Sequence, residues 1–237
     1  MKRAIALLVV LSSAAHDAAH ADPQLVSETR SVPDFRGVDL SGVIDVSVTV
    51  GPQARVVLSG EPDALVKVTT KVKNGVLVVG TKRDLPKHTQ HLKATVTVPD
   101  VSSLSLSGVG DLRVTGVAND SLTLSLSGVG GLKVAGTTGT LRIETSGTGD
   151  VSAKDLAAKT STVVSSGVGD TKVTASQSID ATLSGVGDIS VYGHPAQVRV
   201  AQRRRRYPPP LAGQGPGPWA ARQALPSSTM TANSTGR

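Results

Sequence analysis

The 237-residue chain contains no cysteine and very few aromatic residues. Without thiols it has no disulfide framework, no cysteine-based zinc site and no cysteine nucleophile. Its aromatic residues are one Phe, two Tyr and one Trp. These are too few to build the stacking platforms that hold sugars or single-stranded nucleic acid.

Long apolar runs are also missing, apart from one short segment near the N-terminus. Two basic residues precede the apolar run 4–11, and the Ala-His-Ala sequence at 19–21 fits the cleavage rule for signal peptides. The run is much shorter than the roughly 20 residues that a membrane-spanning helix needs. The sequence therefore predicts a signal peptide over residues 1–21, export to the periplasm or the cell exterior, and no membrane span after cleavage.

The net charge of +7 comes from the two ends of the chain. Residues 201–237 hold six arginines and no acidic residue, and the first three residues hold two more basic groups. Residues 22–200 then carry 17 basic and 17 acidic side chains. Because a neutral body produces no general positive field, we expect no nucleic acid as a partner.

A five-residue motif, Ser-Gly-x-Gly-Asp, recurs through the second half of the chain, and Ser41–Asp45 is a degenerate relative of it. Successive copies are separated by 20, 19, 20 and 18 residues, and Gly131 replaces Asp in the second copy. A repeat of this length is typical of solenoid proteins. The serines and glycines of the five copies are Ser107, Gly108, Gly110, Ser127, Gly128, Gly130, Ser146, Gly147, Gly149, Ser166, Gly167, Gly169, Ser184, Gly185 and Gly187.

Apolar and small polar residues alternate around each motif. Leu104 and Leu106 precede the first copy, and Leu112 and Val114 follow it. A period of two indicates strands with one buried face. Two short strands and two turns in about 19 residues make one coil of a β-solenoid, in which stacked coils place like residues above one another. A meandering sandwich is the alternative, but it does not require the same glycine corner at a fixed step.

The sequence before the repeats predicts further, less regular strands. Asn74-Gly75 is a strong signal for a two-residue hairpin between two of them. This half either begins the solenoid or caps it with a hairpin sheet. The expected strands are Val38–Val50, Arg55–Ser59, Leu65–Val72, Val76–Gly80 and Leu92–Val98.

The Ser-Gly-Val-Gly-Asp series, the Phe-Arg-Gly-Val sequence at 35–38 and the Ala-Thr-Val-Thr-Val-Pro sequence at 94–99 resemble one bacterial family. This is the "putative auto-transporter adhesin, head GIN domain" family, and the resemblance covers roughly residues 30–200. It implies an exported, all-β, right-handed parallel β-helix that fills a single domain over residues 22–200. It also implies an adhesin-like role.

Residues 201–237 break the alternation abruptly with four arginines, three prolines and a Gly/Pro/Ala/Ser-rich run. One interpretation is a disordered, basic, proline-rich tail. The other is a frameshift product. If Gln202 is CAG, the arginines are CGN and Tyr207 is TAY, reading one nucleotide forward permits Ser-Gly-Val-Gly-Asp-Ile from position 202, 18 residues after Ser184. Loss of a cap would leave open strand edges, so we expect self-association through the solenoid ends.

A column of aspartates is the first candidate for chemistry. Asp111, Asp150, Asp170 and Asp188 end four copies of the motif. Stacked carboxylates suit Ca²⁺, which prefers oxygen ligands. However, the calcium-binding nine-residue repeats place Asp differently, and Gly131 interrupts the column. A solvated ladder needs no metal, so we expect no cofactor and keep calcium as an alternative.

Two other groups are weaker candidates. The segment Lys82–His91 contains Asp84, His88 and His91, a set that suits a metal or acid–base catalysis, although such a segment is more often a solvated loop. The repeated serines could be nucleophiles only beside a base and an oxyanion hole. Five equivalent serines favour hydroxyls that bond turn backbone.

The sequence as a whole predicts an exported, non-catalytic β-helix that acts as a scaffold or adhesin-like surface-interaction module. Its expected partner is a protein or a surface polysaccharide. One rival is an enzyme acting on polysaccharides, but the coils between residues 100 and 194 leave only short turns where a cleft would need loops. The other rival is a calcium-stabilised solenoid.

Overall fold

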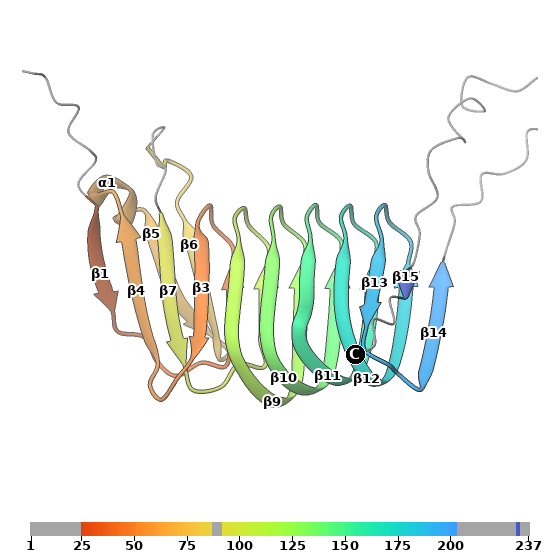
Figure 1. Ribbon diagram of the computed structural model, residues 1–237. Helices are drawn as coiled ribbons and strands as arrows, with labels where there is room; N and C mark the ends of the chain where they lie inside the picture. The colour runs from red at the N-terminus through yellow and green to blue at the C-terminus, as the bar shows by residue number, and fades with distance from the viewer. Residues whose placement is uncertain (1–24, 87–91, 203–230, 233–237) are drawn as a thin grey trace, which may run out of the picture.

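The computed structural model describes residues 25–86, 92–202 and 231–232, and its strands form one continuous sheet wound into a β-solenoid (Figure 1). The predicted signal peptide over residues 1–21, and the predicted tail apart from residues 201–202 and 231–232, lie outside the described residues. The elements in chain order are β1 Val26–Arg30, β2 Gly37–Leu40, β3 Asp45–Val50, β4 Arg55–Gly60, α1 Pro62–Leu65, β5 Val68–Lys73, β6 Val76–Thr81, β7 Lys93–Val98, β8 Ser103–Leu106, β9 Leu112–Leu126, β10 Leu132–Thr145, β11 Val151–Ser165, β12 Thr171–Leu183, β13 Ile189–Tyr192, β14 Gln197–Gln202 and β15 Thr231–Ala232.

The repeats form parallel coils, as predicted. Strands β9 to β12 pair in parallel along nearly their whole length, so that Leu112, Leu132 and Val151 stand above one another. The expectation of two strands and two turns per coil is wrong. Each coil is one curved strand of 13–15 residues, because ladder pairing continues through the bend and the curvature is taken up at register shifts such as Val134/Gly136.

The motif forms the sharp corner between successive coils. Its central residues make a column of parallel bridges from one corner to the next, and Val43 bridges to Val109 at the start of that column. Ser41–Asp45 is therefore the first corner of the solenoid. The column contains Val43, Val109, Val129, Thr148, Val168 and Val186.

Separate short strands build the N-terminal part. The solenoid has two walls. The first wall runs in the order β1-β4-β7-β3, continues into the first halves of β9–β12 and ends at β13. The second wall runs in the order β5-β6-β2-β8, continues into the second halves of β9–β12 and ends at β14. Strands β2 and β3 begin the parallel coils, whereas β1, β4 and β5 pair antiparallel with their neighbours. This half thus both begins the solenoid and caps it.

The hairpin at Asn74-Gly75 is confirmed, with φ of 50° and 74° at the two residues. Two expected strand boundaries need correction. The stretch 38–50 is divided into β2 and β3 because the first corner lies inside it. Leu65 ends the short helix α1, which has proline in its first turn, and β5 starts only at Val68.

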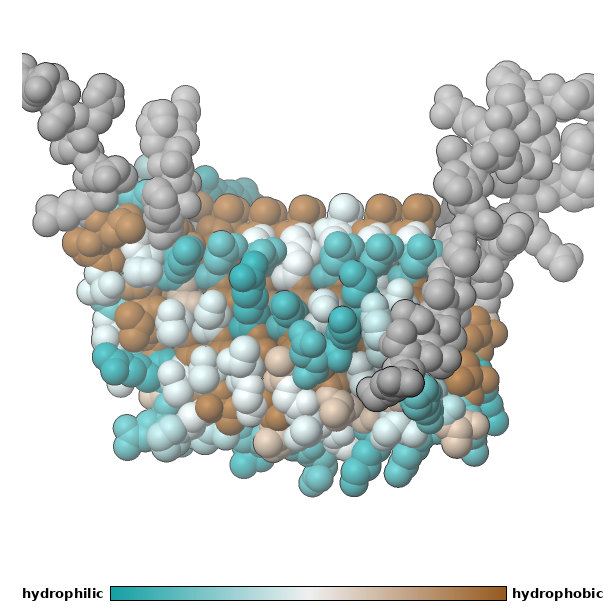
Figure 2. Space-filling view, viewed as in Figure 1, coloured by the Kyte–Doolittle hydropathy of each residue, from teal (hydrophilic) through white to brown (hydrophobic). Residues whose placement is uncertain are grey.

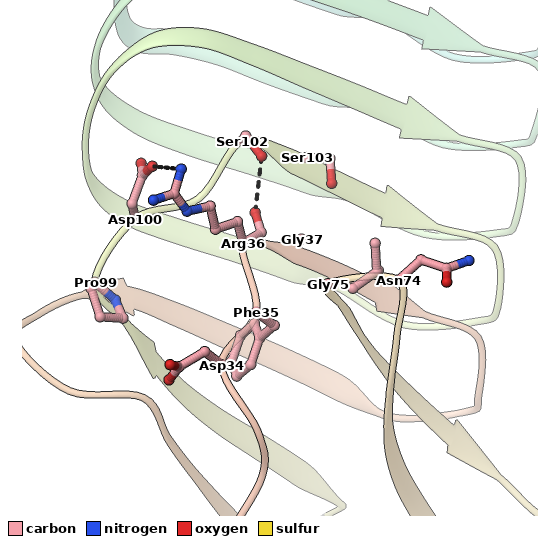
Figure 3. A pocket seen from close by; sticks show the side chains of 11 residues that line it. Asp34, Phe35, Arg36, Gly37, Asn74, Gly75, Pro99, Asp100, Ser102 and Ser103 are labelled. Carbon is pink, nitrogen blue, oxygen red and sulfur yellow. Dashed lines mark hydrogen bonds and ion pairs between the residues drawn. The ribbon is translucent and has the colours of Figure 1, made fainter.

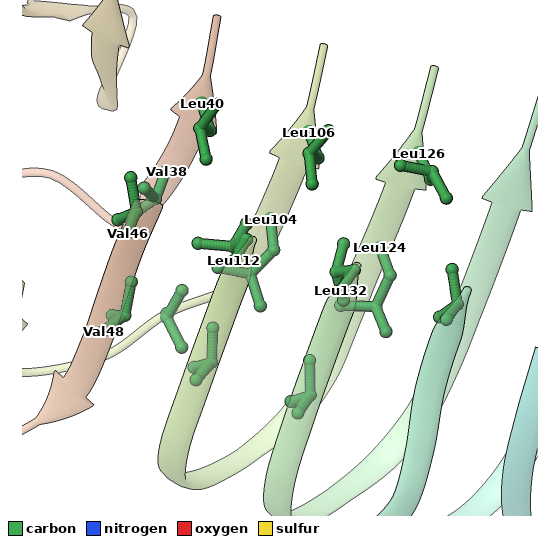
Figure 4. Packing of buried hydrophobic residues seen from close by; sticks show 14 of the residues in the cluster. Val38, Leu40, Val46, Val48, Leu104, Leu106, Leu112, Leu124, Leu126 and Leu132 are labelled. Atoms are coloured by element: carbon green, nitrogen blue, oxygen red, sulfur yellow. The ribbon is translucent and has the colours of Figure 1, made fainter. Parts of the chain in front are cut away.

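The core consists of stacked rows of aliphatic side chains. In Figure 4, Leu40, Leu106 and Leu126 form one such row along the second wall. Parallel register places each residue over its counterpart, and each buried leucine contributes about 1.5–3 kcal/mol. Polar residues enter the interior near β11, where the buried Thr145 hydroxyl donates to Ser165 Oγ at 2.9 Å.

Candidate functional site

The glycines of the motif are fixed by the stacking of one corner on the next. A Cβ on Gly128 would lie 2.0 Å from the carbonyl oxygen of Gly108, so this position has no room for a side chain. Gly130 has φ of +138°, and a Cβ there would also lie 2.0 Å from a carbonyl oxygen, that of Gly110. Close approach of the preceding corner's backbone thus requires glycine at both positions. At the second position the positive φ requires it as well.

The equivalent glycines in the other corners meet the same obstacle. A Cβ at any of them would lie 1.9–2.3 Å from a carbonyl oxygen of the preceding corner. These glycines are Gly108, Gly110, Gly147, Gly149, Gly167, Gly169, Gly185 and Gly187.

The aspartates of the motif link each corner to the following one. Asp150 Oδ1 accepts a hydrogen bond from the Asp170 amide at 2.8 Å, and Asp170 Oδ1 accepts one from the Asp188 amide at 2.9 Å. Asp45 and Asp111 act in the same way toward the next corner. One carboxylate oxygen of each of these residues therefore satisfies a backbone donor, a role that sequence reasoning did not identify.

Gly131 interrupts this ladder. Its own amide donates to Asp111 Oδ1 at 3.0 Å, but a glycine offers no carboxylate to the amide of Asp150 in the next corner. Among the described residues, no group of three or more His, Cys, Asp or Glu side chains gathers closely enough to hold a metal ion.

Three serines of the motif, Ser107, Ser166 and Ser184, contact the backbone of the preceding coil through their hydroxyls. The Ser166 hydroxyl donates to the Thr145 carbonyl at 3.1 Å. The Ser107 hydroxyl lies 3.4 Å from the Leu40 carbonyl and also donates to the side-chain oxygen Asp39 Oδ1 at 2.9 Å. Ser184 makes a longer contact of the same kind, at 3.5 Å. These hydroxyls lie against coil backbone, and no histidine accompanies them in these contacts.

The segment 82–91 is only partly described. His88 and His91 lie outside the described residues, so their proximity to Asp84 stays a prediction. The Lys67 ammonium donates to the Asp84 carboxylate, and this hydrogen bond lowers the pKa of the exposed Asp84 carboxyl below its ordinary value. Asp84 thus has a cationic partner on the neighbouring strand connection, and it is ionised at neutral pH.

The column of central motif residues is exposed, and sequence reasoning missed it. Figure 2 shows it as an apolar row along the upper edge of the molecule. Its five valines are 46–65% exposed. The signal was present in the sequence, since valine fills the variable position of the motif in all but one copy.

A pocket of about 600 Å³ lies at the start of the second wall, where three separate segments meet (Figure 3). Among the lining residues, the Arg36 guanidinium stands 3.9 Å from the Asp100 carboxylate, and the Ser102 hydroxyl donates to the Arg36 carbonyl at 3.3 Å. Asp34 and Asn74 add a carboxylate and an amide to the lining. No spacing in the sequence brings these residues together, although the segments at 35–38 and 94–99 that carry the family resemblance both contribute to the pocket.

A known structure shares this fold. A crystal structure of a "putative adhesin" from Bacteroides fragilis is 21% identical, covers 77% of this chain and 94% of its own, and superposes with a TM-score of 0.65. A "putative adhesin" from Parabacteroides merdae (18% identical, 76% and 93% covered, TM-score 0.47) and a "putative lipid binding protein" from Parabacteroides distasonis (16%, 75% and 94%, TM-score 0.40) are more distant. No curated protein matches the chain.

In the part of the chain that the structure describes, no helix is long and apolar enough to cross a membrane. The family model described as "Putative auto-transporter adhesin, head GIN domain" matches residues 34–195, which agrees with the stacked corners and with the Bacteroides fragilis fold. The chain therefore belongs to the head GIN domain family of adhesin-like proteins.

Proposed function

We propose that the chain is an exported, non-catalytic, adhesin-like module that contacts a surface polysaccharide or a protein through the outer face of the solenoid. The observation that carries this proposal is the shape of the repeat coils. From β9 to β12, strands of 13–15 residues are joined by five-residue corners, so their outward side chains form flat ladders. A polysaccharide-cleaving enzyme would need long loops with carboxylates beside a groove, and these coils have none.

The first wall offers the more distinctive of the two outer faces. Parallel register aligns one outward position from β3 to β13, and three basic side chains, Arg113, Lys133 and Lys172, recur in that column. We call this set the basic column. Arg113 and Lys133 are well exposed, and each has one nearby carboxylate, that of Asp111 and of Asp155. Cations repeated along one direction favour a partner with regularly spaced acidic groups, such as an acidic surface polysaccharide.

Binding of the immobilised chain to arrays of neutral polysaccharides, acidic polysaccharides and matrix proteins tests the proposal. We expect binding to acidic polysaccharides that weakens at high salt. The triple variant Arg113→Ser/Lys133→Ser/Lys172→Ser should weaken it at least tenfold, since serine is the residue found elsewhere in this column. The matched control is Arg142→Ser/Arg199→Ser on the second wall.

The outcomes separate the function from its location. Failure of the unaltered chain to bind any array component would contradict the binding function. Binding that the triple variant leaves unchanged would contradict the basic column, and loss in Arg36→Ala/Asp100→Ala would then assign the contact to the pocket of Figure 3.

Export has its own test. The first 21 residues, fused to a reporter enzyme that is active only outside the cytoplasm, should give activity. Replacing three leucines of the run 4–11 with Asp should abolish it, because the apolar region is what the export machinery recognises. Equal activity from both fusions would contradict the predicted signal peptide.

A further inference from the structure

The C-terminal end of the solenoid leaves core positions uncovered. β14 pairs in parallel with the second half of β12, which places Val198 beside Ile179 and Val200 beside Ala181. The two β12 residues are buried, at 2% and 0% exposure, but Val198 and Val200 are 54% and 51% exposed. Within the described residues β14 pairs with β12 alone. Among the described residues, the other edge of β14 is therefore unpaired at the end of the second wall (Figure 1). Its two inward-facing valines are exposed there.

The register of this last pairing shows where the next corner belongs. Gln202 stands opposite Leu183, the residue directly before the corner serine Ser184. A further corner in this register would therefore start at position 203, 19 residues after Ser184 and one residue later than the sequence alone suggested. The positions that would hold the motif are occupied in the sequence by Arg203–Tyr207.

Arginine does not suit the second and fourth positions of this corner. A Cβ on Gly185 or Gly187 would lie 2.0 or 2.2 Å from a carbonyl oxygen of the coil before. The same stacking applies to any further corner built on Gly185 and Gly187. The residues that the sequence places at these two positions are Arg204 and Arg206.

We propose that the open end is the docking surface for one further coil of the same solenoid, which the gene encodes one nucleotide forward of the frame that gives residues 201–237. With Ala201 as GCN, Gln202 as CAG, arginines as CGN and tyrosine as TAY, the shifted codons are CNC, AGC, three GNC, GNT and AYC. They permit Leu-Ser-Gly-Val-Gly-Asp-Ile. The loss of two nucleotides before codon 201 produces the shift, and restoring them adds one residue, so the leucine then takes position 202, opposite Leu183, and the serine takes position 203, opposite Ser184.

This coil accounts for the exposed valines. Stacked on β14, the coil would cover Val198 and Val200 in the way that β11 and β14 cover Ile179 of β12. It would also form ladder hydrogen bonds with the edge of β14 that faces away from β12. The corner motif supplies the glycines that close stacking requires and an aspartate that continues the carboxylate ladder from Asp188.

The coding DNA from codon 195 onward decides the sequence part of the proposal. We expect the shifted frame to encode Ser-Gly-x-Gly-Asp in phase with position 203, followed by alternating apolar and polar codons. A stop codon within the coil, or residues other than glycine at the motif's second and fourth positions, would overturn it.

The restored-frame protein tests the docking surface. Its melting temperature should exceed that of the 237-residue chain by about 5 °C, because two valines and a strand edge become covered. Light scattering should show less self-association. The control is Val164→Thr, an outward residue of β11, which should shift neither property in either protein. A restored-frame protein with unchanged melting temperature would overturn the proposal, and so would a discrete dimer of the 237-residue chain that Val198→Lys/Val200→Lys disrupts, since the end would then bind a second copy.

Discussion

The repeat coils and the N-terminal third reach the same two-walled architecture by different means. In the coils, every corner rests on the one before it, and the close contact of backbone with backbone decides which residues fit. In the N-terminal third, short strands run in both directions and are held by individual side chains. Arg30 is the clearest case, since its guanidinium donates to the carbonyls of Val68 at 2.7 Å and Leu65 at 3.2 Å and thereby joins β1 to the end of α1 and to β5.

The difference teaches that one substitution has different consequences in the two regions. A corner residue is constrained by neighbours that repeat its own identity, whereas a residue of the N-terminal third is constrained by a unique partner. Each region can therefore be tested by a change that leaves the other intact.

Gly128→Ala should have the largest effect. The new Cβ would meet the Gly108 carbonyl oxygen at 2.0 Å, and neither backbone can withdraw without breaking ladder pairing, so we expect a loss of about 3 kcal/mol or more. Urea denaturation measures it. The control in the other region is Gly75→Ala, where φ is +74° but no atom lies within 4 Å, and the expected cost is about 1 kcal/mol. Equal costs at both sites would contradict the stacking argument.

Arg30→Ala should destabilise the N-terminal cap by about 2 kcal/mol, because two carbonyls lose a charged donor at a largely buried site. Hydrogen exchange should show faster exchange in β1 and β5 with little change in β10 and β11. Arg55→Ala, whose side chain makes one long hydrogen bond to Thr29 at 3.4 Å, is the matched control. Uniformly faster exchange along the solenoid would show that the N-terminal third and the repeat coils unfold as one unit.

Ser161→Ala should stabilise the coils by about 1 kcal/mol. The Ser161 hydroxyl is buried in the row that holds Leu141 and Ile179 in the neighbouring coils, and its oxygen has no hydrogen-bond partner. Thermal unfolding provides the measurement, with the outward-facing Ser152→Ala expected to be neutral. A lower melting temperature for Ser161→Ala would mean that the hydroxyl is satisfied in solution.

Gly131→Asp should give a smaller gain, about 0.5 kcal/mol, by supplying the missing acceptor for the Asp150 amide. The reverse change, Asp170→Ala, removes an acceptor from the Asp188 amide and should cost a similar amount. Asp170→Asn keeps an oxygen acceptor and should therefore cost less stability than Asp170→Ala. Destabilisation by Gly131→Asp would indicate that carboxylate repulsion outweighs the added hydrogen bond.

Calcium should have the smallest effect of all. Because one oxygen of Asp111, Asp150 and Asp170 already accepts a backbone hydrogen bond, we expect the melting temperature to be the same with EDTA and with millimolar Ca²⁺. A ligand that binds only the folded state would raise it, so a calcium-dependent increase that Asp150→Asn removes would support the alternative of a calcium-stabilised solenoid.

The sequence predicted the coils well because their signals are local and repeated. Alternation from Leu104 to Leu126 marks buried and exposed faces, and the repeated glycines mark the corner. The sequence did not show that strand pairing continues through each bend. A glycine such as Gly116 or Gly136 is typical of a turn, and only pairing with the neighbouring coil keeps the residues around it in one strand. The pocket could not be predicted either, since Arg36, Asn74 and Asp100 come from three segments that only the folded chain brings together.

The amino-acid sequence by itself determined a parallel β-solenoid with a glycine corner at a nearly fixed step, because period-two patterning and corner geometry depend on short segments. Tertiary structure alone decided that the aspartates bridge one corner to the next, that Arg30 fastens the N-terminal cap, and that Val198 and Val200 remain exposed. Each of these depends on residues that are distant in the chain and adjacent only once the coils are stacked.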